Sequence, residues 1–274
     1  MREILTFPCE GANLGGTLDS GNKATGLLIV SGGNEIRIGA HRGMARLARI
    51  IAAKGYPVFR FDRRGIGDSE GENHGFQSSG PDIAAALIAF RASCPHLDHV
   101  VAFGNCDAAT ALVVHDAAVD GLLLANPWII ESTDDLPPVA AIRNRYARRL
   151  RDPKAWWAFI TGKLNIRAAR DGFRKISASA PAPQPLANTM AQKLARQRAM
   201  PTIILLASGD NTAIAFADSW SSDLFKDARQ RSDVTVVTLD STSHSFAGEA
   251  DFASLVETVE RALQSFSDAV PARS

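Results

Sequence analysis

The chain of 274 residues has little of what several protein classes require. It contains only three cysteines, Cys9, Cys94 and Cys106, an odd number with no CxxC pair. This argues against a disulfide framework and a structural metal, and reduced thiols are typical of the cytoplasm. Its apolar runs, such as 121–125, are far shorter than the roughly 20 residues of a membrane span. We therefore expect a cytoplasmic protein with no metal and no integral membrane segment.

A charge excess of one sign is also missing, because 30 Lys and Arg residues face 29 Asp and Glu residues. Proteins that coat nucleic acid are normally strongly basic, so we expect no nucleic-acid partner. The segment from Met1 to Gly11 contains an acidic residue early and no apolar core, which argues against a signal peptide. Apolar residues make up 46% of the chain, which is typical of a folded globular protein.

Short β-rich segments alternate with helical patterns, which predicts a mostly parallel sheet of eight strands with helices on both faces. Two N-terminal segments, 3–7 and 14–18, are joined by a Gly/Asn turn and predict an antiparallel pair. The other predicted strands are 26–30, 57–61, 100–103, 121–126, 202–207 and 234–239. The predicted helices are 41–54, 81–92, 108–115 and 249–266.

Residues 131–200 break this alternation and predict a basic helical cap between two core segments, 1–130 and 201–274. The net charge between Pro138 and Met200 is +12, which leaves −11 for the rest of the chain. Within the cap, 177–185 is rich in Ser, Ala and Pro and predicts a loop. The basic side chains could attract an anionic substrate, or they could simply solvate the helices.

The segment Gly104-Asn105-Cys106-Asp107-Ala108 lies between a predicted strand and a predicted helix. Its spacing is that of the nucleophile elbow G-x-S-x-G, with Cys in place of Ser and Ala in place of the second Gly. Such a turn needs small residues on both sides and exposes the central side chain at the carboxyl edge of the sheet. The N-terminus of the following helix would favour the thiolate. A buried structural cysteine is the alternative.

A second motif, Asp62-Arg63-Arg64-Gly65-Ile66-Gly67-Asp68-Ser69, resembles the D-x-R-G-x-G-x-S turn of many α/β-hydrolases, and we interpret it as a mark of the fold. With the elbow, the cap and a histidine after the last strand, nearly the whole chain resembles the α/β-hydrolase superfamily. The narrower resemblance is to the exosortase A system-associated hydrolase 1 family, which occurs beside exopolysaccharide and protein-sorting genes in bacteria. It is carried by Gly32-Gly33, Arg37-x-Gly39-x-His41-Arg42 and Gly104-Asn105-Cys106-Asp107-Ala108-Ala109.

The superfamily's catalytic triad runs in the order nucleophile, acid, histidine, and the resemblance implies Cys106, Asp210 and His244. His244 follows the last predicted strand and would take the thiol proton as general base. Asp210 would orient the imidazole, although it could equally cap the helix that follows it. Gly209 adjoins Asp210, whereas the usual pattern leaves one or two residues between them, so Asp218 is the second choice.

An oxyanion hole needs two backbone donors. By analogy with the superfamily, these are the N–H groups of Asp107 and of Asn34, although the loop around Asn34 could be a plain glycine turn. Arg37, His41 and Arg42 follow that loop. They could grip an anionic part of a substrate, or they could form the solvated first turn of a helix.

Together these residues predict a hydrolase that cleaves an ester or thioester through an acyl-Cys106 intermediate. The expected partner is a small-molecule acyl substrate, with an anionic one favoured by the basic cap, and no cofactor is expected. An acyltransferase with the same triad and a non-catalytic binding protein are the alternatives. The sequence does not predict an oligomeric state.

Overall fold

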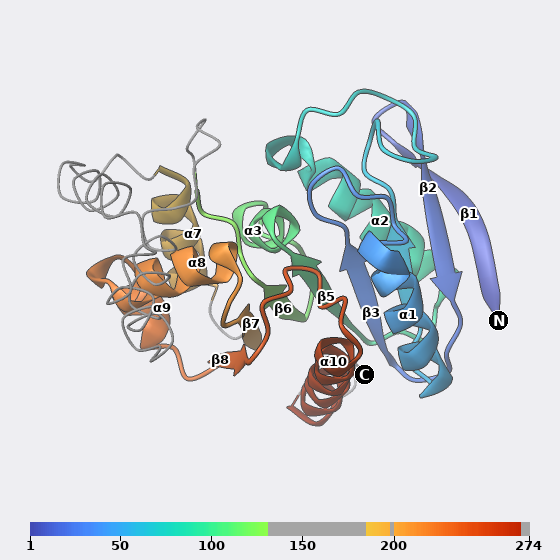
Figure 1. Ribbon diagram of the computed structural model, residues 1–274. Coiled ribbons are helices and arrows are strands. Elements are labelled where there is room, and N and C mark those ends of the chain that lie inside the picture. The colour runs from blue at the N-terminus through green and yellow to red at the C-terminus, as the bar shows by residue number, and fades with distance from the viewer. Residues whose placement is uncertain (131–184, 198–199, 270–274) are drawn as a thin grey trace, which may run out of the picture.

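The computed structural model describes residues 1–130, 185–197 and 200–269. They form an eight-stranded sheet in the order β1-β2-β4-β3-β5-β6-β7-β8. The strands are β1 (Arg2–Cys9), β2 (Ala12–Asp19), β3 (Thr25–Val30), β4 (Val58–Phe61), β5 (His99–Asn105), β6 (Gly121–Ala125), β7 (Thr202–Ala207) and β8 (Val234–Leu239). In Figure 1 the sheet runs from β1, in blue, to β8, in orange.

The pairing of the strands matches the predicted sheet. β2 is antiparallel to both of its neighbours, β1 and β4, whereas every other pair of neighbouring strands is parallel. The mostly parallel, eight-stranded sheet is therefore confirmed, and the predicted segments 202–207 and 234–239 coincide with β7 and β8.

Helices cover both faces of the sheet, as predicted. They are α1 (Gly43–Ala53), α2 (Gly80–Ser93), α3 (Asp107–Val114), α7 (Pro185–Arg196), α8 (Asn211–Ser221), α9 (Lys226–Arg229) and α10 (Glu249–Ala269), with short 3-10 turns η1 (Ala40–Arg42), η2 (Phe76–Ser78) and η3 (Asp223–Phe225). β5 shows why two layers form, because Val101 and Phe103 pack with α1 and α10 while Val100 and Ala102 pack with α2 and α3. A strand buried on both faces needs apolar residues on both, and the middle of β5, from Val100 to Phe103, is entirely apolar.

The first long helix begins later than predicted. The pattern indicates a helix from residue 41, but α1 begins at Gly43. His41 and Arg42 have φ values of 51° and 60°, in the left-handed region, which a right-handed helix cannot contain. Gly39, with a φ of 74°, is the first residue of this segment with a positive φ.

Most of the predicted cap, residues 131–184, lies outside the described residues. Its described part, α7, buries Ala187, Met190 and Leu194 in the core on the α3 face of the sheet. None of the described helices is long and apolar enough to cross a membrane.

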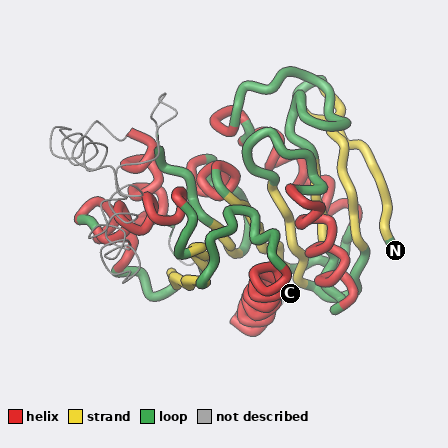
Figure 2. Tube along the Cα trace, in the orientation of Figure 1, coloured by secondary structure: helices red, strands yellow, loops and turns green. Residues whose placement is uncertain are grey.

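The parallel strands bring their following loops to one edge of the sheet. The long loop between β4 and η2 arches over this edge (Figure 2). The loop between β8 and α10, orange to red in Figure 1, runs back from the edge strand towards the middle of the sheet. This path brings residues near 244 to the end of β5, more than a hundred residues earlier in the chain.

Candidate active site

Cys106 occupies the sharp turn that the elbow motif predicts. It lies between β5 and α3 with φ 62° and ψ −126°, a backbone conformation that costs energy for any residue except glycine. A Cβ on Gly104 would lie 2.7 Å from the backbone of Ala108 and Ala109, so this position of the motif must be glycine. The turn therefore holds the half-buried Cys106 at the carboxyl edge and at the N-terminus of α3.

The other two thiols differ from Cys106 in their surroundings. Cys9 and Cys94 are buried, and burial raises the pKa of both, that of Cys9 to about 11, where the neighbouring Asp82 carboxylate adds to the effect. A thiol must ionise to act as a nucleophile, so these two are inert at neutral pH.

His244 and Asp210 meet beside the elbow. The Nδ1 atom of His244 lies 3.0 Å from Oδ2 of Asp210, whose side chain is 10% exposed. The N–H group is not well aligned with the oxygen, so the contact is best described as an ion pair. The same Oδ2 accepts a hydrogen bond of 3.0 Å from the N–H of Ala213 and caps α8. Asp210 thus faces the imidazole and caps a helix at once, whereas Asp218 lies exposed on α8.

The surroundings of His244 favour its charged form. Its pKa is raised from 6.5 to about 10, first by the contact with Asp210 and then by the neighbouring Cys106, while partial burial opposes the shift. At neutral pH the ring is therefore an imidazolium that faces a carboxylate on one side and sulfur on the other. In general, a thiol beside an imidazolium loses its proton more readily than a free thiol.

The raised pKa predicts a dependence of stability on pH. The folded state binds the His244 proton more tightly than the unfolded chain, so this stabilisation is complete below pH 6.5 and is lost as the pH rises to about 10. Urea unfolding of the wild type and of His244→Ala at a series of pH values measures it. The free energy of unfolding of the wild type, relative to that of His244→Ala, is expected to fall steadily between pH 6.5 and about 10. A constant difference would contradict the raised pKa.

Two amide side chains, the half-buried Asn105 and the buried Asn126, hold the histidine loop in place, and the sequence analysis missed this role. Nδ2 of Asn105 donates to the carbonyl oxygen of His244 at 3.1 Å, and Nδ2 of Asn126 donates to the same oxygen at 3.2 Å. The Oδ1 atom of Asn126 accepts from the N–H of Ala207 at 2.9 Å. Asn126 follows β6, is fully buried and has a φ of 42°, a conformation that Asn tolerates better than most residues. In the sequence, the only sign of this network is a single asparagine at the end of each of two apolar segments.

We expect Asn126→Gly to destabilise the fold and to reduce the acyl transfer that the sequence predicts. Glycine relieves the left-handed backbone, so any loss reports the amide contacts, and one orphaned buried group costs about 1–3 kcal/mol. Urea unfolding and kcat measure the two effects, and Asn126→Ala serves as the comparison that adds backbone strain. Unchanged stability in Asn126→Gly would show that the amide contacts contribute nothing.

A small pocket of about 110 Å³ opens beside the sulfur. Cys106 and His244 line it together with Gly32, Gly33 and Glu35, which belong to the loop after β3. The N–H of Glu35 bonds to the carbonyl of Gly32 at 3.1 Å, so this loop is a tight turn. The turn packs against the elbow, since a Cβ on Gly32 would lie 2.4 Å from the carbonyl oxygen of Asn105.

The two predicted oxyanion donors lie on either side of the contact between Gly32 and Asn105. Asp107 is the first residue of α3, directly after Cys106, and Asn34 is at the tip of the turn. The side chain of Asn34 accepts a hydrogen bond of 2.8 Å from Asn73. Whether the two N–H groups stabilise an oxyanion remains a prediction.

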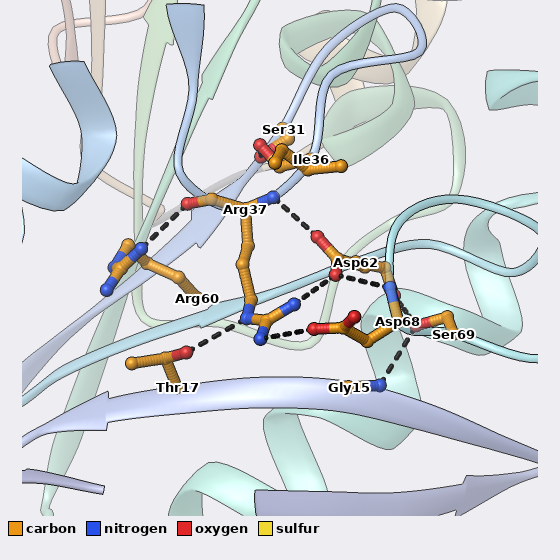
Figure 3. Close-up of polar contacts among 9 residues, drawn as sticks. All are labelled: Gly15, Thr17, Ser31, Ile36, Arg37, Arg60, Asp62, Asp68 and Ser69. Atoms are coloured by element: carbon orange, nitrogen blue, oxygen red, sulfur yellow. Dashed lines mark hydrogen bonds and ion pairs between the residues drawn. The ribbon is translucent and has the colours of Figure 1, made fainter. Parts of the chain in front are cut away.

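Arg37 takes part in an ion network (Figure 3) and does not belong to the lining of the pocket beside Cys106. Its Nε donates to Thr17 at 2.9 Å, its Nη2 to Asp68 at 2.8 Å, and its Nη1 pairs with the fully buried Asp62. Arg60 donates to the Arg37 carbonyl at 2.8 Å and joins the network from β4. The guanidinium of Arg37 is thus committed to the chain itself, and it ties the loop after β3 to the turn after β4.

The other two predicted substrate-binding residues stand at the surface. His41 and Arg42 are exposed in η1, in the left-handed conformation that precedes α1. They precede α1 and do not belong to its first turn, and neither belongs to the lining of the pocket beside Cys106. Within the described ranges, no three His, Cys, Asp or Glu side chains are grouped as a metal site requires.

The strand order, the elbow after β5 and the histidine loop after β8 together define an α/β-hydrolase fold. The chain belongs to the family described as serine aminopeptidase, S33, whose profile matches residues 26–251. Its candidate nucleophile departs from that description, since a cysteine occupies the elbow. Among proteins with curated descriptions, none matches this chain in sequence.

Solved structures show the same fold. An esterase from Pyrococcus furiosus superposes with a TM-score of 0.65 at 15% identity, over 96% of this chain and 91% of the other. A proline iminopeptidase from Mycobacterium smegmatis gives 0.58 at 12% identity, over 97% and 99%. An α/β hydrolase from Sphaerobacter thermophilus gives 0.56 at 19% identity, over 93% and 100%. At these identities the likeness concerns the fold.

Proposed function

We propose that the protein transfers acyl groups from an ester or thioester to water through an acyl-Cys106 intermediate. The observation that carries this proposal is the position of His244 between Asp210 and Cys106, with its pKa raised to about 10. A ring that stays protonated at neutral pH is a poor base towards a serine hydroxyl. It is well suited to stabilise a thiolate and to protonate a leaving group.

The steps follow from this charge arrangement. The Cys106 thiolate adds to the acyl carbon, and the tetrahedral intermediate collapses as the imidazolium of His244 gives its proton to the departing alkoxide or thiolate. Neutral His244 then takes a proton from water as the water attacks the acyl-cysteine. The acid leaves, and the thiolate and imidazolium are restored. Asp210 keeps the ring oriented and stabilises its charged form throughout.

The substrate class is proposed from the pocket and the family. A space of about 110 Å³ suits a small acyl group, so we propose a small-molecule acyl substrate with its larger part towards solvent. Attraction of an anionic substrate by the basic cap, a cytoplasmic location and the association with exosortase systems are further parts of this proposal. They rest on the net charge of residues 138–200 and on the family resemblance given above.

Mass spectrometry of the intact protein tests the acyl-enzyme directly. Incubation with nitrophenyl acetate or an acyl-coenzyme A thioester is expected to add one acyl mass, mapped to the Cys106 peptide, together with a burst of released leaving group. Cys106→Ala should show neither, and Cys94→Ala, which removes a buried thiol, should behave as the wild type. Acylation of wild type and Cys106→Ala to the same extent would contradict the proposal.

The fate of the acyl-Cys106 adduct distinguishes a hydrolase from the two alternatives, an acyltransferase and a binding protein. Hydrolysis in buffer indicates a hydrolase, whereas an adduct that turns over only after an alcohol or amine acceptor is added indicates an acyltransferase. The absence of any adduct with a broad panel of esters and thioesters would favour a binding protein that has kept the fold without the chemistry.

A further inference from the structure

The carboxylate of Asp107 reaches from the elbow to the turn after β3. Its Oδ1 atom accepts a hydrogen bond of 2.6 Å from the N–H of Gly33, and a Cβ on Gly32 would lie 3.0 Å from the same oxygen. Gly33 has a φ of 57°, and it lines the pocket beside Cys106. The side chain of the residue after the candidate nucleophile therefore fixes the opposite wall of the pocket.

A buried cation completes this contact. The side chain of Arg63 is 4% exposed, and its Nη2 donates to the carbonyl oxygen of Gly33 and lies 3.8 Å from Oδ2 of Asp107. Its Nε and Nη1 atoms have no hydrogen-bond partner within the described residues. A buried guanidinium needs a counter-charge, and Asp107 is the carboxylate that the structure places beside it. The carboxylate of Asp107 thus binds the N–H of Gly33, and the guanidinium of Arg63 binds the carbonyl oxygen of the same residue.

We propose that Asp107 and Arg63 are positioning residues that clamp Gly33 and so set the oxyanion turn against the elbow. The inference rests on the proposed acyl transfer. With the N–H of Gly33 engaged, the next amide, that of Asn34, stays free of any acceptor in the described structure, and the clamp fixes its direction. An oxyanion hole works only when its donors are held in place before the charge develops.

The clamp predicts that loss of the Asp107 carboxylate affects two reactions of the Cys106 sulfur, acylation and alkylation, to different extents. Alkylation by iodoacetamide needs the thiolate but develops no oxyanion, whereas acylation by an ester needs both. Asp107→Ala is expected to slow acylation by nitrophenyl acetate about 10- to 100-fold, less than the loss of a whole donor, while alkylation at pH 7 is no slower. Asp107→Asn keeps an oxygen that accepts from Gly33 and should recover most of the acylation rate. Asp223→Ala, which removes an exposed acid from the first turn of η3, is the matched control.

Hydrogen exchange supplies a readout that does not need turnover. The amides of residues 32–35 should exchange about tenfold faster in Asp107→Ala than in the wild type, and those of Asp107→Asn should stay near wild-type protection. Slower acylation with unchanged alkylation and faster exchange supports the clamp. Acylation that is unchanged or faster in Asp107→Ala, an equal loss in both reactions, or unchanged exchange would overturn it. A wild type that is never acylated refutes the proposed function, while the exchange result still decides on the clamp.

Discussion

Replacement of Cys106 by serine is expected to lower acyl transfer about 10²- to 10⁴-fold, although serine is the nucleophile that the elbow motif usually carries. The reason lies in the raised pKa of His244. A hydroxyl needs a neutral imidazole to take its proton, and Asp210, the largest cause of the raised pKa, remains beside the ring in this variant and favours the imidazolium. The serine hydroxyl therefore does not ionise by itself, and it has no neutral base beside it to take its proton.

The burst of nitrophenol from nitrophenyl acetate measures this effect at neutral pH. Cys106→Ala sets the background, and Cys94→Ser, which makes the same change at a buried thiol, controls for effects on folding. The rate of Cys106→Ser should rise towards high pH as His244 loses its proton. A serine variant that matches the wild type near pH 7 would contradict the thiolate–imidazolium assignment.

The second large effect is expected from Asp210→Asn, because Asp210 makes two contacts, with His244 and with Ala213, that this substitution separates. Asn is as good a helix cap as Asp, so the bond to Ala213 and the stability of α8 should survive. The negative charge beside Nδ1 of His244 is lost, so the pKa of the ring should fall and kcat should drop about 10²- to 10⁴-fold.

Asp210→Ala is the matched comparison. It loses the charge and the cap together, so its activity should be equally low while its free energy of unfolding falls by about 1 kcal/mol more than that of Asp210→Asn. Urea unfolding and the titration of the His244 ring by NMR measure both properties. Full activity in Asp210→Asn would leave helix capping as the only role of Asp210.

The elements that a local pattern determines were predictable from the sequence. An apolar strand followed by small-x-Cys-x-small predicted the turn at Cys106, because strand and helix can approach only if Gly104 has no side chain. Apolar runs of strand length predicted β7 and β8. The order of Cys106, Asp210 and His244 along the chain, carried by the resemblance, predicted residues that the structure does bring together.

Contacts between distant segments were harder to predict. The pattern gives no sign that Asn126 binds the carbonyl of His244, because the bond depends on where the loop after β8 turns back. Arg37 was considered for substrate binding because a cation beside a glycine loop suggests an anion, yet the partner proves to be the chain's own Asp62. The start of α1 was misplaced because apolar periodicity does not register the left-handed backbone at His41.

The central proposal is that His244 assists Cys106 as a nucleophile, and the rate of alkylation of Cys106 by iodoacetamide as a function of pH tests this most directly. Peptide mapping distinguishes Cys106 from Cys9 and Cys94, whose buried thiols serve as internal references. We expect Cys106 to react rapidly well below pH 7 in the wild type and to slow at least about tenfold there in His244→Ala, since the thiolate fraction of an unassisted thiol falls tenfold per pH unit below its usual pKa near 8.5. Alkylation of wild type and His244→Ala along the same curve, rising only near pH 8.5, would contradict the account.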